Sequence, residues 1–151
     1  MRYFEDLAVG DTNAFGSYEV TRDEVLDFAG KYDPQPFHLS DEGAEGTHFG
    51  RLAASGWHTC AMTMAMIVRD MQANDTGGLG AAGIDELRWL KPVYPGDVLR
   101  VESEVVETRA FRSKPDMGSA LTRSTVFNQA DEPVMSFLAT GLYRRREGAA
   151  S

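Results

Sequence analysis

The feature that most constrains this chain is an uncharged run from Leu52 to Val68, bounded by Arg51 and Arg69. Its residues are apolar nearly all the way around a helix, so we expect that helix to be enclosed by other elements. The run is too short and too polar for a membrane span. It therefore predicts a buried core helix from Ala53 to about Met71.

The second half of the chain predicts strands. Residues 99–106 and 134–141 alternate side chains in the period-two manner of strands with one buried face. Segments 84–90 and 121–128 complete four late strands, and an earlier strand is expected over residues 13–20. One long helix followed by an antiparallel meander predicts an α+β fold in which the sheet curls around the helix.

Shorter signals complete the predicted organisation. A capping box at Thr21–Glu24 predicts a short helix that ends at Gly30. The glycine-rich stretch Gly77–Gly83 is expected to end the long helix. We expect a single domain over residues 1–151, with a frayed tail from about 147 to 151.

The charge balance limits the partners of the chain. Fifteen basic and twenty-three acidic residues give a net charge of −8, which argues against nucleic acid, because its binders need a basic surface. A few local cations still suffice for one anionic small ligand. The single cysteine, Cys60, allows no intrachain disulfide, and acidic residues stand where a signal peptide would have an apolar run. We therefore expect a cytoplasmic protein that binds neither nucleic acid nor membrane.

The most informative segment is the loop from residue 32 to residue 38, which reads Tyr-Asp-Pro-Gln-Pro-Phe-His. Each proline fixes its own φ and restricts the residue before it, so the loop can hold Asp33 and His38 toward one point at low entropic cost. A carboxylate beside an imidazole supplies two proton-transfer groups of different pKa. Either residue alone is usually a structural feature of a loop, but the pair predicts an acid–base site.

A second element lies at the entry to the long helix, where Ser55, Gly56 and Trp57 follow one another. Free backbone N–H groups and the positive end of the helix dipole meet at such a place. Gly56 has no side chain to obstruct a ligand atom. The segment predicts an oxyanion hole built on the Gly56 N–H, with Ser55 and Trp57 beside the substrate.

The remaining histidines and the cysteine predict no second centre. The spacing of His48 and His58 matches no compact ligand motif, so we expect no metal site. We expect His58 to be packed or hydrogen-bonded in the first helical turn. Cys60 lies two residues after His58 and does not share its helix face, so a thiol nucleophile is not expected.

These residues resemble the MaoC-like dehydratase family, which includes the R-specific enoyl-CoA hydratases. The family motif is Asp, two residues, Pro, one residue, His, and it stands here as Asp33 to His38. The segment Gly50–Gly56 resembles the family's entry to its central helix. Trp89–Asp97 resembles a strand and turn shared by many hotdog proteins, and Phe4–Asp11 resembles a common family opening.

Three positions of the motif depart from the usual hydratase pattern. Tyr32 stands in place of Gly, Gln35 in place of Asn, and Phe37 in place of an aliphatic residue. These changes leave the acid–base residues in place and bear on the acyl group that the protein prefers.

The resemblance implies a hotdog fold, a homodimer or a dimer-based higher oligomer, and an acyl-CoA thioester bound at the subunit interface. It implies Asp33 and His38 as the catalytic pair and Gly56 as the amide that contacts the thioester oxygen. The implied reaction is the reversible addition of water to a trans-2-enoyl-CoA in fatty acid metabolism. No cofactor is expected, because coenzyme A is part of the substrate.

The phosphates of coenzyme A need cations. The candidates are Arg88, Lys91, Arg109, Arg112 and Lys114. The alternative for the last three is a solvated hairpin tip with no ligand.

Two other functions fit the same features. A hotdog thioesterase would use a carboxylate and the same helix-start amides, but would direct water at the carbonyl. The Asp33–His38 loop favours the hydratase, because proton delivery to carbon needs a second group. A non-catalytic acyl-CoA binding module, which belongs to another class, would explain the fold without needing the pair.

Overall fold

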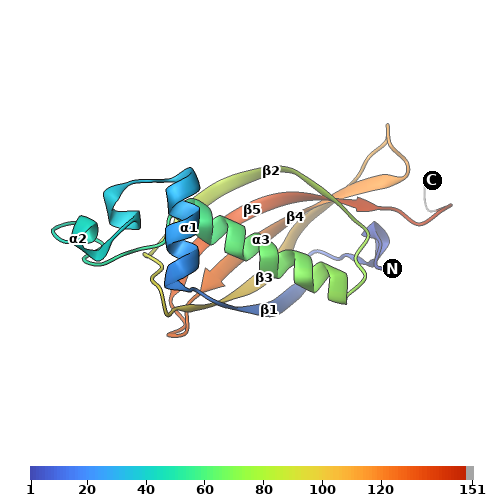
Figure 1. Ribbon diagram of the computed structural model, residues 1–151. Helices are drawn as coiled ribbons and strands as arrows, with labels where there is room; N and C mark the ends of the chain where they lie inside the picture. The colour runs from blue at the N-terminus through green and yellow to red at the C-terminus, as the bar shows by residue number, and fades with distance from the viewer. Residues whose placement is uncertain (149–151) are drawn as a thin grey trace.

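A computed structural model of the chain describes residues 1–148, and Figure 1 shows one long helix lying across a curved sheet. The sheet has five antiparallel strands in the order β1-β3-β4-β5-β2. The strands are β1 (Thr12–Glu19), β2 (Gly78–Trp89), β3 (Val98–Ala110), β4 (Met117–Phe127) and β5 (Pro133–Arg144). The expected sheet curled around one helix, which is the hotdog architecture, is confirmed.

The long helix is α3 (Gly56–Ala73), and the other helical elements are η1 (Phe4–Asp6), α1 (Arg22–Tyr32), η2 (Pro36–His38) and α2 (Asp41–Ala44). Figure 1 places α1 and α2 at one end of the molecule, near the start of α3, and the hairpin between β3 and β4 at the other end. Within the described residues, no helix combines the length and hydrophobicity needed to cross a bilayer.

The core lies between α3 and the concave face of the sheet. Its buried side chains include Met62, Met66, Leu99, Val101, Val126, Val134 and Met135. Burying one such side chain contributes about 1.5–3 kcal/mol, so this layer holds helix and sheet together. Gly16, with φ +91°, bends β1 around the helix, and a Cβ there would lie 2.6 Å from the Met66 sulfur.

The structure corrects two predicted boundaries of the long helix. It begins at Gly56 rather than Ala53, because the N–H groups of Ala53 and Ala54 bond to the carbonyls of Phe37 and Val93 in an extended segment. The helix ends at Ala73, and most of the Gly77–Gly83 stretch belongs to β2. The glycines therefore form an edge strand where we expected only a break.

Two predicted chain ends also differ. α1 runs on to Tyr32 instead of ending at Gly30, because the Asp33 N–H still bonds to the Ala29 carbonyl. Of the expected frayed tail, Glu147 and Gly148 form a turn, and residues 149–151 lie outside the described residues.

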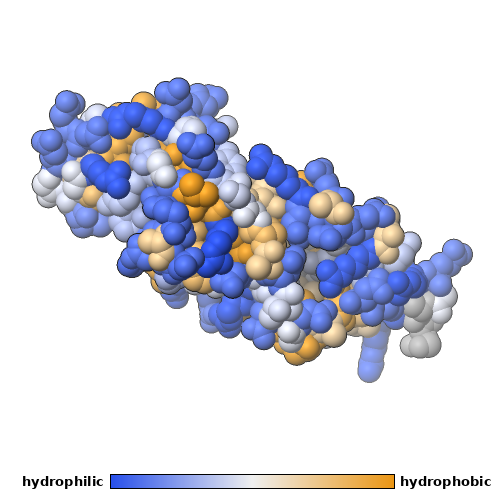
Figure 2. Space-filling model, turned by 90° about the horizontal axis from the view of Figure 1, so that it is seen from below, coloured by the Kyte–Doolittle hydropathy of each residue, from blue (hydrophilic) through white to orange (hydrophobic). Residues whose placement is uncertain are grey.

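One side of α3 remains uncovered, so the expectation of a fully enclosed helix is wrong for the single chain. Trp57, Met64 and Val68 lie along this side and are 58%, 50% and 38% exposed, and Ile84 on the edge strand β2 is 51% exposed. Figure 2 shows that the face seen from below is mostly hydrophilic, with hydrophobic residues gathered near its middle.

Candidate active site

Asp33 and His38 converge as the proline-stiffened loop predicts. Asp33 caps the C-terminus of α1, and His38 is the last residue of the 3₁₀ turn η2 that Pro36 begins. The Asp33 Oδ2 lies 3.5 Å from the His38 Nε2, and both side chains are largely buried. The two proton-transfer groups therefore share one space at the end of α1.

The imidazole of His38 is held in one orientation. Its Nδ1 lies 2.7 Å from the carbonyl oxygen of Ala53. Because a carbonyl can only accept, Nδ1 carries a proton and donates it, and the neutral ring then has its lone pair on Nε2. The nitrogen that faces Asp33 is thus the one available for proton transfer.

Both oxygens of Asp33 accept hydrogen bonds from neutral side chains. The Ser55 hydroxyl donates to Oδ2 at 2.7 Å, and the Gln35 amide donates to Oδ1 at 2.7 Å. Burial raises the pKa of Asp33, but these two hydrogen bonds and the charge of His38 outweigh it, so the pKa lies below its ordinary value. The carboxylate is therefore ionised at neutral pH.

Gly56 is the first residue of α3 and follows Ser55, whose side chain caps the helix by accepting from the Trp57 N–H at 3.2 Å. Among the described residues, no acceptor bonds the Gly56 N–H. The indole of Trp89 packs on Gly56 and donates to its carbonyl at 2.9 Å, and a Cβ at this position would lie 2.5 Å from the ring. The site needs glycine here for lack of space.

Ser55 and Trp57 were both predicted to contact substrate, and the structure separates them. Ser55 is fully buried, with its hydroxyl committed to Asp33 and to the helix cap. Trp57 is exposed and packs edge-on against Trp89 with ring centroids 5.1 Å apart. The Trp57 side chain is thus open to a ligand, whereas the Ser55 hydroxyl faces the Asp33 carboxylate.

The candidate phosphate-binding cations fall into two separate groups. Lys91 pairs with Glu132, and exposed Arg88 donates to the Leu87 carbonyl. The hairpin cations Arg109, Arg112 and Lys114 lie at the opposite end of the sheet from α1, as Figure 1 shows. α3 alone spans roughly 27 Å at 1.5 Å per residue, so the same chain's hairpin stands far from Gly56.

The remaining histidines and the cysteine lie outside the Asp33 site. His58 stacks on Phe28 with centroids 4.7 Å apart, and exposed His48 packs against Phe49. Burial raises the pKa of the Cys60 thiol, which disfavours a thiolate. Residues 1–148 contain no group of three or more His, Cys, Asp or Glu side chains that could hold a metal ion.

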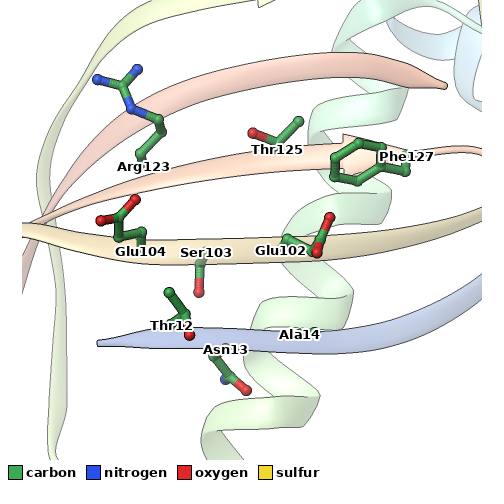
Figure 3. Close-up of a pocket in the computed structure, with 9 residues that line it drawn as sticks. All are labelled: Thr12, Asn13, Ala14, Glu102, Ser103, Glu104, Arg123, Thr125 and Phe127. Carbon is green, nitrogen blue, oxygen red and sulfur yellow. The ribbon is translucent and has the colours of Figure 1, made fainter. Parts of the chain in front are cut away.

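The structure also has a shallow hollow of about 470 Å³, well away from Asp33. Figure 3 shows its lining on β1, β3 and β4, with Glu102, Glu104 and Arg123 turned away from α3. Its mixed charges and open shape give no sign of a reaction centre.

Sequence reasoning missed the roles of two residues. Gln35 appeared only as a departure from the family motif, and it proves to bond the carboxylate two residues before it. Trp89 appeared only within a strand-and-turn segment, and it proves to hold the Gly56 peptide. An amide two residues from the key acid was a usable signal for Gln35, but nothing local indicated that Trp89 would reach Gly56.

Comparison with known proteins agrees with this fold. Residues 7–126 match the family described as "MaoC like domain". The MaoC-like dehydratase from Rhodospirillum rubrum is 41% identical, with a TM-score of 0.86, over 95% of this chain and 97% of that one.

Two relatives carry the names of enzymes. A protein of Cereibacter sphaeroides named mesaconyl-CoA hydratase is 31% identical over 99% of this chain, which spans only 43% of that protein. A protein of Methylorubrum extorquens named 3-hydroxybutyryl-CoA dehydratase is 36% identical over 70% of this chain and 64% of its own length. The family match covers most of the chain and both groups of site residues, so the protein belongs to the MaoC-like dehydratase family.

Proposed function

We propose that this protein catalyses the reversible addition of water to a trans-2-enoyl-CoA thioester. The observation that carries the proposal is the 3.5 Å approach of Asp33 Oδ2 to His38 Nε2, with both side chains largely buried and the unbonded Gly56 N–H at the neighbouring helix start. Relatives named as a CoA-thioester hydratase and a dehydratase support the reaction class. The reaction requires no cofactor beyond the coenzyme A of the substrate.

In this mechanism, a water molecule is held between Asp33 and His38. As the water oxygen bonds to the β-carbon, the pair takes a proton from it, and a proton is delivered to the α-carbon. The pair ends in the protonation state in which it began, and the thioester stays intact. Positioned acid–base groups of this kind contribute roughly a hundredfold to ten-thousandfold in rate.

Gly56 supplies the third group. Negative charge builds on the thioester oxygen when water attacks the β-carbon, and the unbonded Gly56 N–H stands at the positive end of α3. A donor of this type contributes about 3 kcal/mol to the transition state. The Trp89 indole donates to the Gly56 carbonyl. This hydrogen bond fixes the orientation of the peptide group that directly follows the Gly56 N–H.

The thioesterase and the acyl-CoA binding module would require fewer of the ordered contacts around Asp33 and His38. Hydrolysis at the carbonyl would not need a second proton donor aimed at carbon, and simple binding would not need an ionised carboxylate beside an oriented imidazole. The ordered hydrogen bonds on both Asp33 oxygens and on His38 Nδ1 favour acid–base chemistry over both.

A homodimer explains the uncovered surfaces. Two identical β2 edges related by a two-fold axis pair antiparallel, which removes an exposed edge from each chain. The exposed stripe of Trp57, Met64 and Val68 would be covered in the same assembly. We expect Met64→Glu to shift the protein toward a monomer in sedimentation analysis, with loss of activity.

The same dimer would bring the hairpin cations of one chain toward the Asp33 site of the other. Antiparallel pairing sets the Trp89 end of one β2 against the Gly78 end of the other, which is the end of the sheet that carries the β3–β4 hairpin. Arg109, Arg112 and Lys114 of the second copy then approach the site of the first. Neutralising all three should raise KM about tenfold for enoyl-CoA and leave KM unchanged for the matching enoyl-pantetheine, which lacks the nucleotide phosphates.

Crotonyl-CoA tests the function itself. Loss of enoyl absorbance without release of free thiol would support hydration. Release of thiol would support the thioesterase, and tight binding of enoyl- and hydroxyacyl-CoAs without turnover would support the binding module. His48→Ala is the matched control for His38→Ala, because His48 is also a loop histidine but is exposed and packs on Phe49.

A further inference from the structure

Ser55 joins the two halves of the site. Its hydroxyl donates to Asp33 Oδ2 at 2.7 Å and accepts from the Trp57 N–H at 3.2 Å. Ser55 has no exposed surface, so neither solvent nor substrate contacts it directly. It is also 22 positions from Asp33, so this contact depends on the tertiary fold.

We propose that Ser55 is a positioning residue, which fixes the Asp33 carboxylate to the first turn of α3 beside the Gly56 N–H. The inference deepens the proposed function and rests on it. Through Ser55, the acid–base pair and the oxyanion donor become one rigid unit, although they belong to different elements. Correct placement of reacting groups within a fraction of an ångström is a large part of catalysis.

The direction of the hydrogen bonds decides what Ser55 does to the carboxylate. A serine hydroxyl has a single proton, and the Trp57 N–H can only donate, so the proton of Ser55 goes to Asp33. Gln35 occupies the other oxygen with an amide proton. Protonating Asp33 would break one of these bonds, so the network favours the ionised carboxylate and leaves the imidazole of His38 to carry a proton taken from water.

The charged surroundings of Asp33 are simple. Ser55 at the N-cap of α3 and Gln35 in the loop are neutral, and among the described residues His38 on η2 is the titratable group whose charge acts on the carboxylate. A change in the titration of Asp33 after substitution at position 55 can therefore be assigned to the lost hydroxyl.

The test uses Ser55→Ala and Ser55→Gly, with Ser55→Thr as the conservative variant. Glycine costs little as a helix N-cap, so Ser55→Gly removes the hydroxyl even if alanine disturbs folding. Both should lower kcat for crotonyl-CoA hydration by about tenfold to a hundredfold with KM within about twofold, the loss expected for one hydrogen bond to a charged group. Ser55→Thr should restore most of kcat.

Thr21→Ala is the matched control. Thr21 caps α1 by accepting from the Glu24 N–H at 3.3 Å, and its carbonyl accepts from the Val25 N–H, so these bonds stay within α1. It loses a helix cap of the same kind and should leave kcat unchanged.

A second readout does not depend on turnover. The ¹³C signal of the Asp33 carboxyl, assigned by comparison with Asp33→Asn, should titrate at a higher pH in Ser55→Ala and Ser55→Gly than in the parent protein. An unchanged midpoint with a kcat equal to that of Thr21→Ala would overturn the inference. The midpoint could instead shift in a protein that hydrates no enoyl-CoA. That result would support the positioning of Asp33 by Ser55, and it would contradict only the proposed function.

Discussion

Two histidine–carboxylate pairs flank the start of α3, and they are built differently. His38 Nε2 lies 3.5 Å from Asp33, and His58 Nε2 lies 3.7 Å from Glu24. Both imidazoles are buried, yet His38 anchors its Nδ1 on a carbonyl, whereas the Nδ1 of His58 has no hydrogen-bond partner within residues 1–148. Asp33 is largely buried, whereas Glu24 is half exposed and accepts from the Tyr18 hydroxyl.

The difference shows that residue types and distance do not by themselves make an acid–base pair. The Asp33 pair has an oriented ring, a carboxylate bonded at both oxygens and a free helix-start N–H beside it. The Glu24 pair has a ring fixed mainly by stacking on Phe28 and a carboxylate open to water. These contacts are the reason that we propose the acid–base chemistry for the first pair and a packing role for the second.

The largest expected effect separates the two carboxylates. Asp33→Asn should lower kcat/KM for crotonyl-CoA by about a hundredfold to ten-thousandfold, because the pair loses a charged proton-transfer group. Glu24→Gln makes the same chemical change in the other pair and should stay within about twofold. Equal losses in steady-state assays of the two variants would break the comparison.

The second effect concerns the Gly56 N–H, which the proposed mechanism uses together with the Asp33–His38 pair. Gly56→Ala keeps the N–H but presses a Cβ against Trp89, and Gly56→Pro also removes the N–H. Proline is well tolerated at the first position of a helix, and the extended Ser55 suits the residue before it. We expect kcat of Gly56→Pro to lie roughly a hundredfold below that of Gly56→Ala. Matching values would show that this N–H stabilises no charge.

A smaller effect compares the hydrogen bonds that support each carboxylate. Gln35→Leu removes the donor to Asp33 Oδ1 and should lower kcat roughly tenfold. Tyr18→Phe removes the donor to Glu24, a bond of 2.6 Å, and should leave kcat unaltered. If Tyr18→Phe proved the slower enzyme, the second pair would have to share in the chemistry.

The smallest effect concerns stability and belongs to the second pair. Burial lowers the pKa of His58 and the nearby Glu24 raises it only in part, so the net shift is downward. The unfolded chain then takes up the proton first, and stability falls as pH drops through about 6.5 toward the folded value. Between pH of about 7.5 and 5.5, the melting temperature should fall roughly 2–4 °C more in the parent than in His58→Gln. Parallel curves would show that His58 does not titrate on unfolding.

Much of this site could be predicted from sequence because its signals are local. Asp33 and His38 share one loop that Pro34 and Pro36 stiffen. The uncharged run predicted the central helix, and the alternating segments after it predicted the sheet that curls around it. The prediction that His58 packs in the first helical turn is confirmed by its stacking on Phe28.

The parts that could not be predicted depend on tertiary contacts or on a second surface. Ser55 reaches Asp33, and Trp89 reaches Gly56, across long stretches of chain. The glycines before Gly83 suggested a break, but pairing with β5 makes them a strand. The hydrophobicity of α3 suggested complete enclosure, yet one side stays open in the single chain, because hydrophobicity does not reveal which molecule covers it.

The most direct test of the central claim is an NMR analysis of crotonyl-CoA incubated with the protein in D₂O. If Asp33 and His38 add water across the double bond, the product is a 3-hydroxyacyl thioester with deuterium at the α-carbon and no free coenzyme A. Neither Asp33→Asn nor His38→Ala should form it at a comparable rate. An intact double bond with released thiol, or full product formation by either variant, would contradict the account.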